Sequence, residues 1–316
     1  MRSNGARDSS EERIFVMSET RDPGLTGGAG GAPVAVARRD IVRSIHYTLS
    51  YTVQNAERGP RGAIVLLHDL PGGAFVWEPV MAALAATGRA VYAFDMLGYG
   101  QSDKPWPSDT SVWGHADCLG YAFKALGLEE IILVGFGLGG GVAQTLATRL
   151  YRDGVAKLAL INSYAYQTAF APDWPLPDMT KHQELEAPLH LTQEQVEQEL
   201  RQTLPTGSAR GLSAARVDAY AAEWNSKTGK NLLLQHVRLL NPLYMNAVAS
   251  DVTRLDIPLL LIWGERDTVT PLALGQRIAR EAKRATLETV AGADHLILDD
   301  SPDQVAKSLA RFAAQG

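Results

Sequence analysis

The sequence predicts an α/β fold: a mostly parallel sheet with helices on both faces and a helical insertion. From residue 41 onward, short apolar runs alternate with longer segments that have helical periodicity. Uninterrupted apolar strands are typical of parallel sheets, because helices cover both faces of such a sheet. Glycine-rich or polar loops follow several of the apolar runs, and in an open α/β sheet such loops line the ligand-binding edge.

Seven segments are expected to form strands, and from residue 63 onward each is a short, continuous apolar run. These segments are residues 41–51, 63–68, 90–95, 131–136, 158–162, 258–263 and 286–290. Strands that alternate with helices imply right-handed crossover connections.

Five segments between the strands are expected to form helices, namely residues 77–87, 111–126, 138–152, 271–284 and 302–314. The last two follow Thr270 and Ser301, which can cap exposed N–H groups and precede a proline at the first helical position. Ser301 and Gln304 also have the spacing of a capping box.

The alternation stops at residues 163–248, which we expect to form a helical lid inserted in a core of residues 41–162 and 249–316. The insertion opens with aromatic residues and prolines and continues with helical segments at 193–204, 213–225 and 230–240. Thr192 and Gln195 form a capping box there. Residues 1–40 are rich in Ser, Gly, Arg and acidic residues, so we expect a mobile tail.

Composition excludes several classes of protein. The chain has 316 residues, a formal charge of −5 and one cysteine, Cys118. This charge argues against binding to nucleic acid or anionic membranes, and no apolar stretch reaches the roughly 18 residues of a membrane span. A single cysteine excludes an intrachain disulfide and a cysteine-rich metal site. We expect a cytoplasmic protein whose partner is a small-molecule substrate.

Five loops that follow strand candidates carry the residue types of a catalytic site. They are His68-Asp69-Leu70-Pro71-Gly72, residues 95–105, Gly135-Phe136-Gly137-Leu138-Gly139-Gly140, residues 263–267 and Gly292-Ala293-Asp294-His295. The third loop opens a helix. In this order, the five segments resemble the α/β-hydrolase superfamily over nearly all of residues 41–316. The resemblance is strongest to lidded members such as epoxide hydrolases, haloalkane dehalogenases, haloperoxidase-like esterases and carbon–carbon bond hydrolases.

The strand-to-helix turn around residue 137 resembles the nucleophile elbow of that superfamily. Such a turn lifts one side chain from the sheet toward the N-terminus of a helix and the backbone N–H of the next residue. Gly135 and Gly139 supply the flanking glycines. The central position is Gly137, where the family carries Ser, Asp or Cys, and glycine has no side chain that could form a covalent intermediate.

The resemblance places the triad acid at Asp267 and the base at His295, in the family's chain order. Glu265 is a weaker substitute for the acid. The backbone N–H groups of Leu70 and Leu138 would form the oxyanion hole, where each donor contributes about 2.7–4 kcal/mol to transition-state stabilisation.

Other residues are predicted to contact substrate, each with a structural alternative. The set is His68, Asp69, Phe136, Tyr164 and Trp174. Asp69 replaces a glycine of the family motif, and we favour a turn-forming role for it over a site carboxylate. Ser102 lies in an architectural segment, and Cys118 is expected in the core. Metal-ligand spacing and a phosphate-binding loop are both missing, so no metal or cofactor is expected.

Gly137 leaves three interpretations open. In the favoured one, the protein is an enzyme without a covalent intermediate. His295, oriented by Asp267, removes a proton from a moderately apolar, carbonyl-containing substrate or from a water above Gly137. Lyase, cyclase, decarboxylase, oxygenase and direct hydrolase reactions all fit this scheme. In the second, Gly137 is an engineered replacement of a serine in an esterase. In the third, the protein is a ligand-binding pseudoenzyme.

Overall fold

The computed structural model describes residues 36–166, 192–240 and 242–315. In this part of the chain, eight strands form one sheet in the order β1-β2-β4-β3-β5-β6-β7-β8. The strands are β1 (Arg38–Ser44), β2 (Tyr47–Gln54), β3 (Ile64–Leu67), β4 (Val91–Phe94), β5 (Ile131–Phe136), β6 (Val155–Ile161), β7 (Leu259–Gly264) and β8 (Ala285–Val290). β1 and β2 are antiparallel to their neighbours, and the remaining pairs are parallel. The predicted α/β fold is confirmed.

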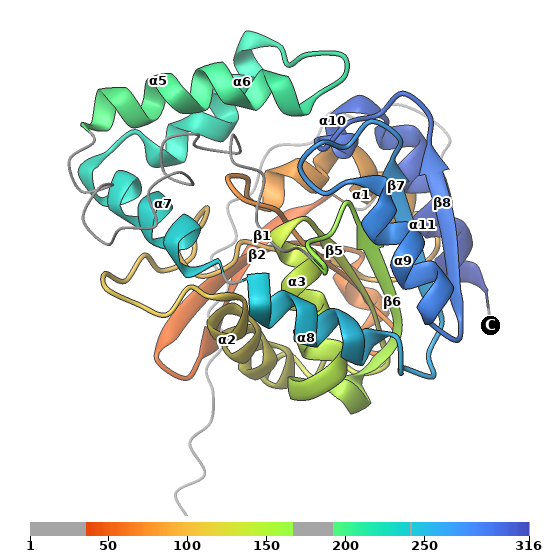
Figure 1. Ribbon diagram of the computed structural model, residues 1–316. Helices are drawn as coiled ribbons and strands as arrows, with labels where there is room; N and C mark the ends of the chain where they lie inside the picture. The colour runs from red at the N-terminus through yellow and green to blue at the C-terminus, as the bar shows by residue number, and fades with distance from the viewer. Residues whose placement is uncertain (1–35, 167–191, 241, 316) are drawn as a thin grey trace, which may run out of the picture.

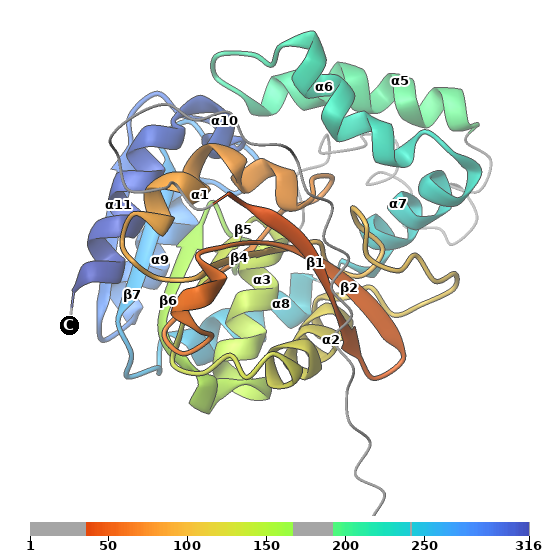
Figure 2. The same cartoon turned by 180° about the vertical axis from the view of Figure 1, so that it is seen from behind.

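Helices cover both faces of the sheet. The helices of the described residues are α1 (Glu78–Ala85), α2 (Val112–Ala125), α3 (Leu138–Thr145), α5 (Gln193–Thr203), α6 (Ala214–Ala221), α7 (Lys227–Leu239), α8 (Pro242–Val252), α9 (Leu272–Glu281), α10 (Ile297–Asp300) and α11 (Pro302–Ala314). Figure 1 shows α2, α3 and α8 in front of the sheet, and Figure 2 shows α1 and α11 on the opposite face. This coverage explains why every residue of β3, β4, β5 and β7 is buried.

Strand β5 lies inside the sheet, between β3 and β6. Its last residue, Phe136, is followed by Gly137 and then by helix α3. The loops that leave β3, β7 and β8 end at the same edge, since these strands run parallel to β5. This topology brings four loops that are distant in the sequence to one place.

Two local predictions are wrong. The strand expected at residues 41–51 is a hairpin of β1 and β2, whose turn at Ile45 and His46 contains no Gly, Asn or Asp to mark it. Neither Ser301 nor Thr270 caps a helix with its side chain. Ser301 has φ −148° and ψ 53°, far from the extended conformation of a cap, and Thr270 uses its hydroxyl elsewhere.

Helices α5, α6 and α7 lie beyond the edge of the sheet where the parallel strands end, with α5 and α6 at the top and α7 at the left of Figure 1. The capping box of Thr192 and Gln195 at the start of α5 is confirmed. Helix α8 lies instead against α3 and runs past residue 248, the expected end of the lid. The start of the expected lid, residues 167–191, and most of the expected tail, residues 1–35, lie outside the described residues.

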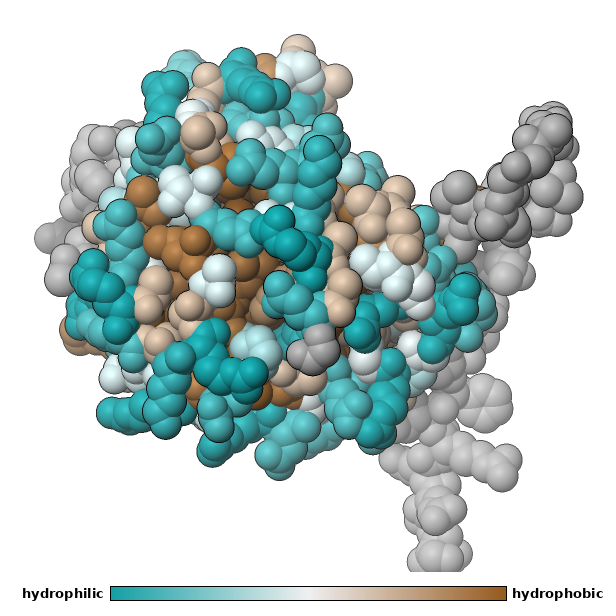
Figure 3. All heavy atoms as spheres, turned by 90° about the vertical axis from the view of Figure 1, so that its right-hand side faces the viewer, coloured by the Kyte–Doolittle hydropathy of each residue, from teal (hydrophilic) through white to brown (hydrophobic). Residues whose placement is uncertain are grey.

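The side of the molecule beyond edge strand β8 presents hydrophobic atoms framed by hydrophilic ones (Figure 3). Among the described helices, none combines the length and the apolar character that crossing a membrane would require. Cys118 is buried in α2, as expected for a core residue. Ser102 is also buried, and its hydroxyl donates to the Asp95 carbonyl oxygen.

Candidate active site

The turn that joins β5 to α3 has the backbone of a strained elbow. Gly137 has φ 52° and ψ −115°, a conformation that glycine adopts at little steric cost. Gly139, two residues later, lies so close to β3 that an added Cβ would stand 2.3 Å from the Leu67 carbonyl oxygen. The chain therefore makes the sharp turn that the sequence predicts, but no side chain rises from its apex.

The carboxylate of Asp69, from the loop after β3, occupies the space above Gly137. A Cβ built on Gly137 would lie 2.0 Å from Asp69 Cγ. Asp69 is 2% exposed, and its Oδ1 accepts a hydrogen bond of 2.6 Å from the backbone N–H of Leu138. Its Oδ2 lies 2.9 Å from His295 Nε2. The side chain of Asp69 thus belongs to the site, whereas the sequence favours a turn-forming role.

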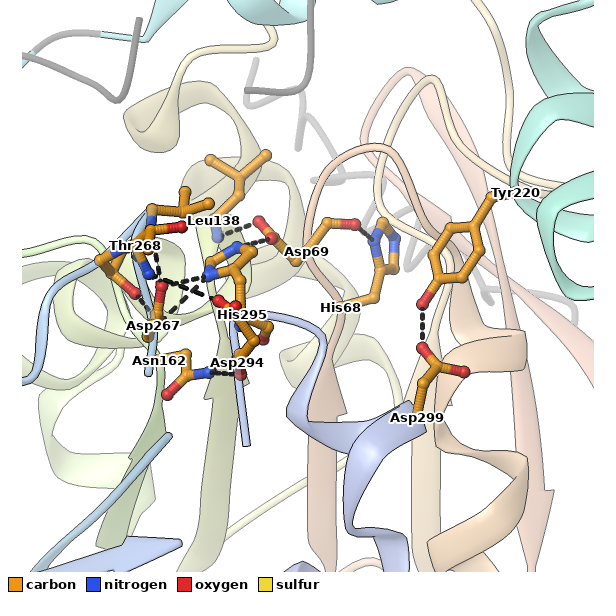
Figure 4. A network of polar contacts seen from close by, with 12 residues as sticks. His68, Asp69, Leu138, Asn162, Tyr220, Asp267, Thr268, Asp294, His295 and Asp299 are labelled. Carbon is orange, nitrogen blue, oxygen red and sulfur yellow. Dashed lines mark hydrogen bonds and ion pairs between the residues drawn. The ribbon is translucent and has the colours of Figure 1, made fainter. Parts of the chain in front are cut away.

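His295 links two carboxylates that come from different loops (Figure 4). Its Nδ1 lies 3.1 Å from Asp267 Oδ2, and its Nε2 faces Asp69. The imidazole is fully buried, and the ring of Phe136 packs against it with 5.6 Å between centroids. The order of contacts is therefore Asp69, His295, Asp267, above the elbow.

Backbone and hydroxyl donors fix the carboxylate of Asp267. Its Oδ1 accepts hydrogen bonds from the N–H groups of Val269 and Thr270, and its Oδ2 accepts one from the Thr270 hydroxyl. Sequence reasoning assigned Thr270 to a helix cap instead. An aspartate followed by a threonine three residues later in a loop is a signal for this arrangement.

Asn162 fixes the loop that carries His295. Its side-chain amide donates to the carbonyl oxygens of Asp294 and His295 and accepts from the N–H of Gly264. It therefore connects the ends of β6, β7 and β8 beneath the site. Sequence reasoning missed Asn162, although a polar residue directly after a buried strand is a sign of such a role.

The electrostatics of the site favour a charged imidazole. Burial alone lowers the pKa of His295, but the carboxylates of Asp267 and Asp69 outweigh burial and raise the pKa to about 10. At neutral pH the ring is therefore an imidazolium between two anionic groups. A protonated Nε2 can donate a proton to a leaving group, and the same atom can accept one once a neighbouring negative charge is removed.

The other predicted contacts are placed as follows. Both ring nitrogens of His68 are used, one with the Asp69 carbonyl oxygen and one as acceptor for the Met96 N–H, so this ring supports the Asp69 loop. Tyr164 is buried, and burial together with the charges of Asp69 and Asp267 raises its pKa. Leu70 is buried too. Trp174 lies outside the described residues.

Helix α6 and the turn after it lie against the segment that follows Asp69. The indole N–H of Trp224 donates to the Pro71 carbonyl oxygen, and the ring of Tyr220 in α6 packs edge-on against Phe75. The Tyr220 hydroxyl donates to Asp299 in α10, directly after the His295 loop (Figure 4). Across the described ranges, no cluster of three His, Cys, Asp or Glu side chains has the arrangement of a metal site.

The chain is similar to known proteins in both sequence and fold. The family model described as "alpha/beta hydrolase fold" matches residues 62–302. A haloalkane dehalogenase of Psychrobacter cryohalolentis is 26% identical over 274 residues, which cover 82% of this chain and 86% of that protein. A haloalkane dehalogenase of Sphingobium indicum is 28% identical over 272 residues, covering 81% and 90%.

Solved structures share the fold. An alpha/beta hydrolase fold protein from Burkholderia ambifaria superposes with a TM-score of 0.73 at 21% identity, covering 86% of this chain and 99% of that one. Haloalkane dehalogenase DbeA from Bradyrhizobium elkani superposes with a TM-score of 0.73 at 20% identity, covering 88% and 98%.

Proposed function

Since the chain belongs to the α/β-hydrolase fold family, we propose that it is an enzyme that acts on a small, moderately apolar organic molecule by proton transfer at His295. Asp267 orients the imidazole and stabilises its charged form. The observation that carries this proposal is the buried sequence of contacts Asp69, His295, Asp267 directly above the elbow. A base held by a third group and facing a reactive centre is the arrangement of acid–base catalysis.

Proton transfer at His295 is retained, but the carbonyl group of the expected substrate is not. The sequence predicts an oxyanion hole of the Leu70 and Leu138 N–H groups that polarises a carbonyl, with a water above Gly137. The Leu138 N–H instead donates to Asp69, whose carboxylate fills the space above the glycine. A carbonyl group is therefore not required by the geometry. Relatives named as haloalkane dehalogenases favour hydrolytic displacement over lyase, cyclase, decarboxylase or oxygenase chemistry.

The two alternative interpretations fit the geometry less well. An engineered loss of serine would require a natural Cβ at residue 137, which would stand 2.0 Å from Asp69 Cγ. A binding protein would have no use for three buried ionisable groups, because burying charges costs free energy that an apolar pocket avoids.

The proposal is tested with the variant His295→Ala and a panel of short epoxides, bromoalkanes and p-nitrophenyl esters. We expect kcat/KM to fall roughly a hundredfold to ten-thousandfold for every compound that the wild type converts, because the acid and base are lost. His46→Ala is the matched control, since His46 is exposed in the β1–β2 turn. Unchanged turnover in His295→Ala would contradict the proposal, and a ligand that binds tightly and is recovered intact would favour a binding protein.

A further inference from the structure

We propose that the carboxylate of Asp69 is the nucleophile of this enzyme. Asp69 extends from the loop after β3 into the place that the side chain of an elbow residue at position 137 would occupy. This inference rests on the proposed function, because it assigns the bond-forming step to a group beside His295. The chemical class of substrate that follows is a molecule with a saturated carbon that carries a leaving group, such as a halide or the oxygen of an epoxide.

The volumes of residues 69 and 137 are complementary. With a Cβ at residue 137, the Asp69 carboxylate would have to leave its position, since Cγ and both Oδ atoms lie 2.0–2.3 Å from that Cβ. With glycine at residue 137, the carboxylate of Asp69 lies against the apex of the turn without a clash. The glycine and the aspartate, each a departure from the family pattern, therefore compensate each other.

The loop that carries Asp69 is held rigidly, as a nucleophile requires. The Asp69 carbonyl oxygen accepts a hydrogen bond from the Gly72 N–H and contacts His68 Nδ1. The opposite nitrogen of His68 is bound to the Met96 N–H at the end of β4. From above, Trp224 donates to Pro71. These contacts fix the backbone on both sides of the carboxylate.

The two oxygens of the Asp69 carboxylate have different hydrogen-bond partners, and we infer a different chemical role for each from this difference. Oδ2, beside His295, forms a bond to the saturated carbon of the substrate, and the bond from that carbon to the leaving group breaks with its electron pair. A halide departs as the anion, whereas an epoxide oxygen takes the proton of the His295 imidazolium. The product of this step is an ester of Asp69.

Water completes the reaction at Asp69 Cγ. His295 Nε2 takes a proton from the water, and the resulting hydroxide adds to Cγ. Negative charge develops on Oδ1, which already accepts the Leu138 N–H, so this donor becomes the oxyanion site for the second step. Collapse breaks the bond between Cγ and Oδ2, and the departing alkoxide takes the proton of the new Cγ–OH, which restores the carboxylate. For a halide the sum is R–X plus water giving R–OH plus HX, and for an epoxide it is addition of water to give a diol.

Esterification prepares His295 for that second step. The negative charge of Asp69 is one of the two that raise the pKa of the imidazole. Forming the ester neutralises this charge, so the pKa of the imidazole falls. After a halide has left, the ring releases its proton to solvent water, whereas after epoxide opening it has already given that proton to the alkoxide. In both cases the neutral ring then acts as the base. Asp267 keeps the ring in position throughout, because its contact with Nδ1 does not change.

The experiment is covalent labelling with an epoxide that carries a nitrophenyl ether, followed by proteolysis and mass spectrometry. The wild type, His295→Gln, Asp69→Asn and Asp117→Asn are compared, and thermal unfolding checks that each is folded. Asp117 is an exposed carboxylate on α2 and serves as the control. Glutamine retains an N–H that can assist ring opening but cannot activate water, so His295→Gln should accumulate one adduct on Asp69.

We expect the wild type and Asp117→Asn to hydrolyse the epoxide with little adduct, and Asp69→Asn to lose about a thousandfold or more of the activity. If His295→Gln is inactive without an adduct on Asp69, or if Asp69→Asn remains active, the inference fails while the proposed function stands. If His295→Gln turns over normally through an Asp69 adduct, the proposed function fails and the nucleophile assignment stands. If none of the four proteins forms an adduct or hydrolyses the epoxide, the proposed substrate class is wrong.

Discussion

The contact between Asp69 and Gly137 decides the chemistry of the site, because it determines which side chain faces His295. A carboxylate in this position is held by the N-terminus of α3 through the Leu138 N–H and by the imidazolium. Helix N-termini and cationic groups both stabilise an anion. The site therefore binds its own carboxylate where an oxyanion hole would otherwise be open to substrate.

Replacing the elbow glycine tests this contact directly. We expect Gly137→Ser to lower the free energy of unfolding by about 1–3 kcal/mol, because the new Cβ displaces the carboxylate from a packed site. The measurement is urea unfolding of Gly137→Ser, Gly88→Ser and Asp69→Gly/Gly137→Ser. Gly88 also has a positive φ, +78°, but open space around it, so this control isolates backbone strain from the clash.

The double variant should be more stable than Gly137→Ser alone, since removing the carboxylate makes room for the serine. It should also gain activity toward p-nitrophenyl acetate, because the Leu138 N–H becomes free. Equal losses in Gly137→Ser and Gly88→Ser, with no recovery in the double variant, would show that the two residues do not compete for space.

Sequence reasoning found part of this site. Asp267 and His295 were predicted to belong together, and the structure brings their side chains into contact. The orientation of Asp69 was missed, because an aspartate after a strand serves equally well as a turn former or as a site carboxylate. The departures at residues 69 and 137 were interpreted separately, and only their spatial contact reveals that one compensates the other.

Among the larger elements, helices α6 and α7 and the loop before α6 contact the rest of the fold on two sides of the site. Helix α10, which follows the His295 loop, contacts α6 and the loop before it through Asp299 and Asp300: Asp299 accepts from Tyr220, and Asp300 accepts from the Ser208 hydroxyl. On the other side, His236 of α7 stacks on Tyr99 with 4.2 Å between ring centroids, and His115 of α2 lies 5.6 Å from His236. These contacts fix α6 and α7 next to the loops that carry the site residues.

The two stacked histidines make stability depend on pH. Burial lowers the pKa of His115 from 6.5 to about 3 and lowers that of His236 as well. Above pH 6.5 these groups are neutral in both the folded and the unfolded chain. Below pH 6.5, these histidines bind protons in the unfolded chain but stay neutral in the folded chain. Their contribution to the free energy of unfolding therefore decreases as the pH falls toward 3.

We expect burial of His115 to lower the free energy of unfolding by about 1.5–2 kcal/mol as the pH falls from 6.5 to 5, and burial of His236 to act in the same direction. The measurement is urea unfolding of the wild type, His115→Phe and the exposed control His46→Ala across this range. His115→Phe should show a shallower slope of stability against pH, whatever its stability at neutral pH, whereas His46→Ala should keep the wild-type slope. Identical slopes in all three proteins would contradict burial of a neutral His115.

The positions of the strands were predicted more accurately than the turns and helix caps at their ends. Each parallel strand was expected within a few residues, because coverage on both faces leaves an unbroken apolar run. The hairpin of β1 and β2 was read as one strand since its two-residue turn lacks turn-forming residues. Ser301 failed as a cap because a short helix, α10, ends at that point and fixes its backbone.

At the scale of the whole molecule, the sheet order explains how four distant loops form one site. β5 lies between β3 and β6, and β7 and β8 follow in turn, so the loops with Asp69, Gly137, Asp267 and His295 meet at one edge. Parallel strands joined by right-handed crossovers, which the alternation of strands and helices predicts, place these loops at one edge. The partners of each side chain at that edge do not follow from the pattern, because they depend on packing between loops.

The chemistry proposed for the site requires Asp69 to form and then lose a covalent bond to substrate. The most direct measurement is a single turnover, with enzyme in excess over a converted epoxide or bromoalkane, in water enriched in the heavy oxygen isotope. Hydrolysis at Asp69 Cγ predicts that the heavy oxygen enters the peptide that contains Asp69, while the first molecule of alcohol carries ordinary oxygen from the carboxylate. Heavy oxygen in that alcohol and an unlabelled Asp69 would show direct attack by water and would exclude Asp69 as the nucleophile.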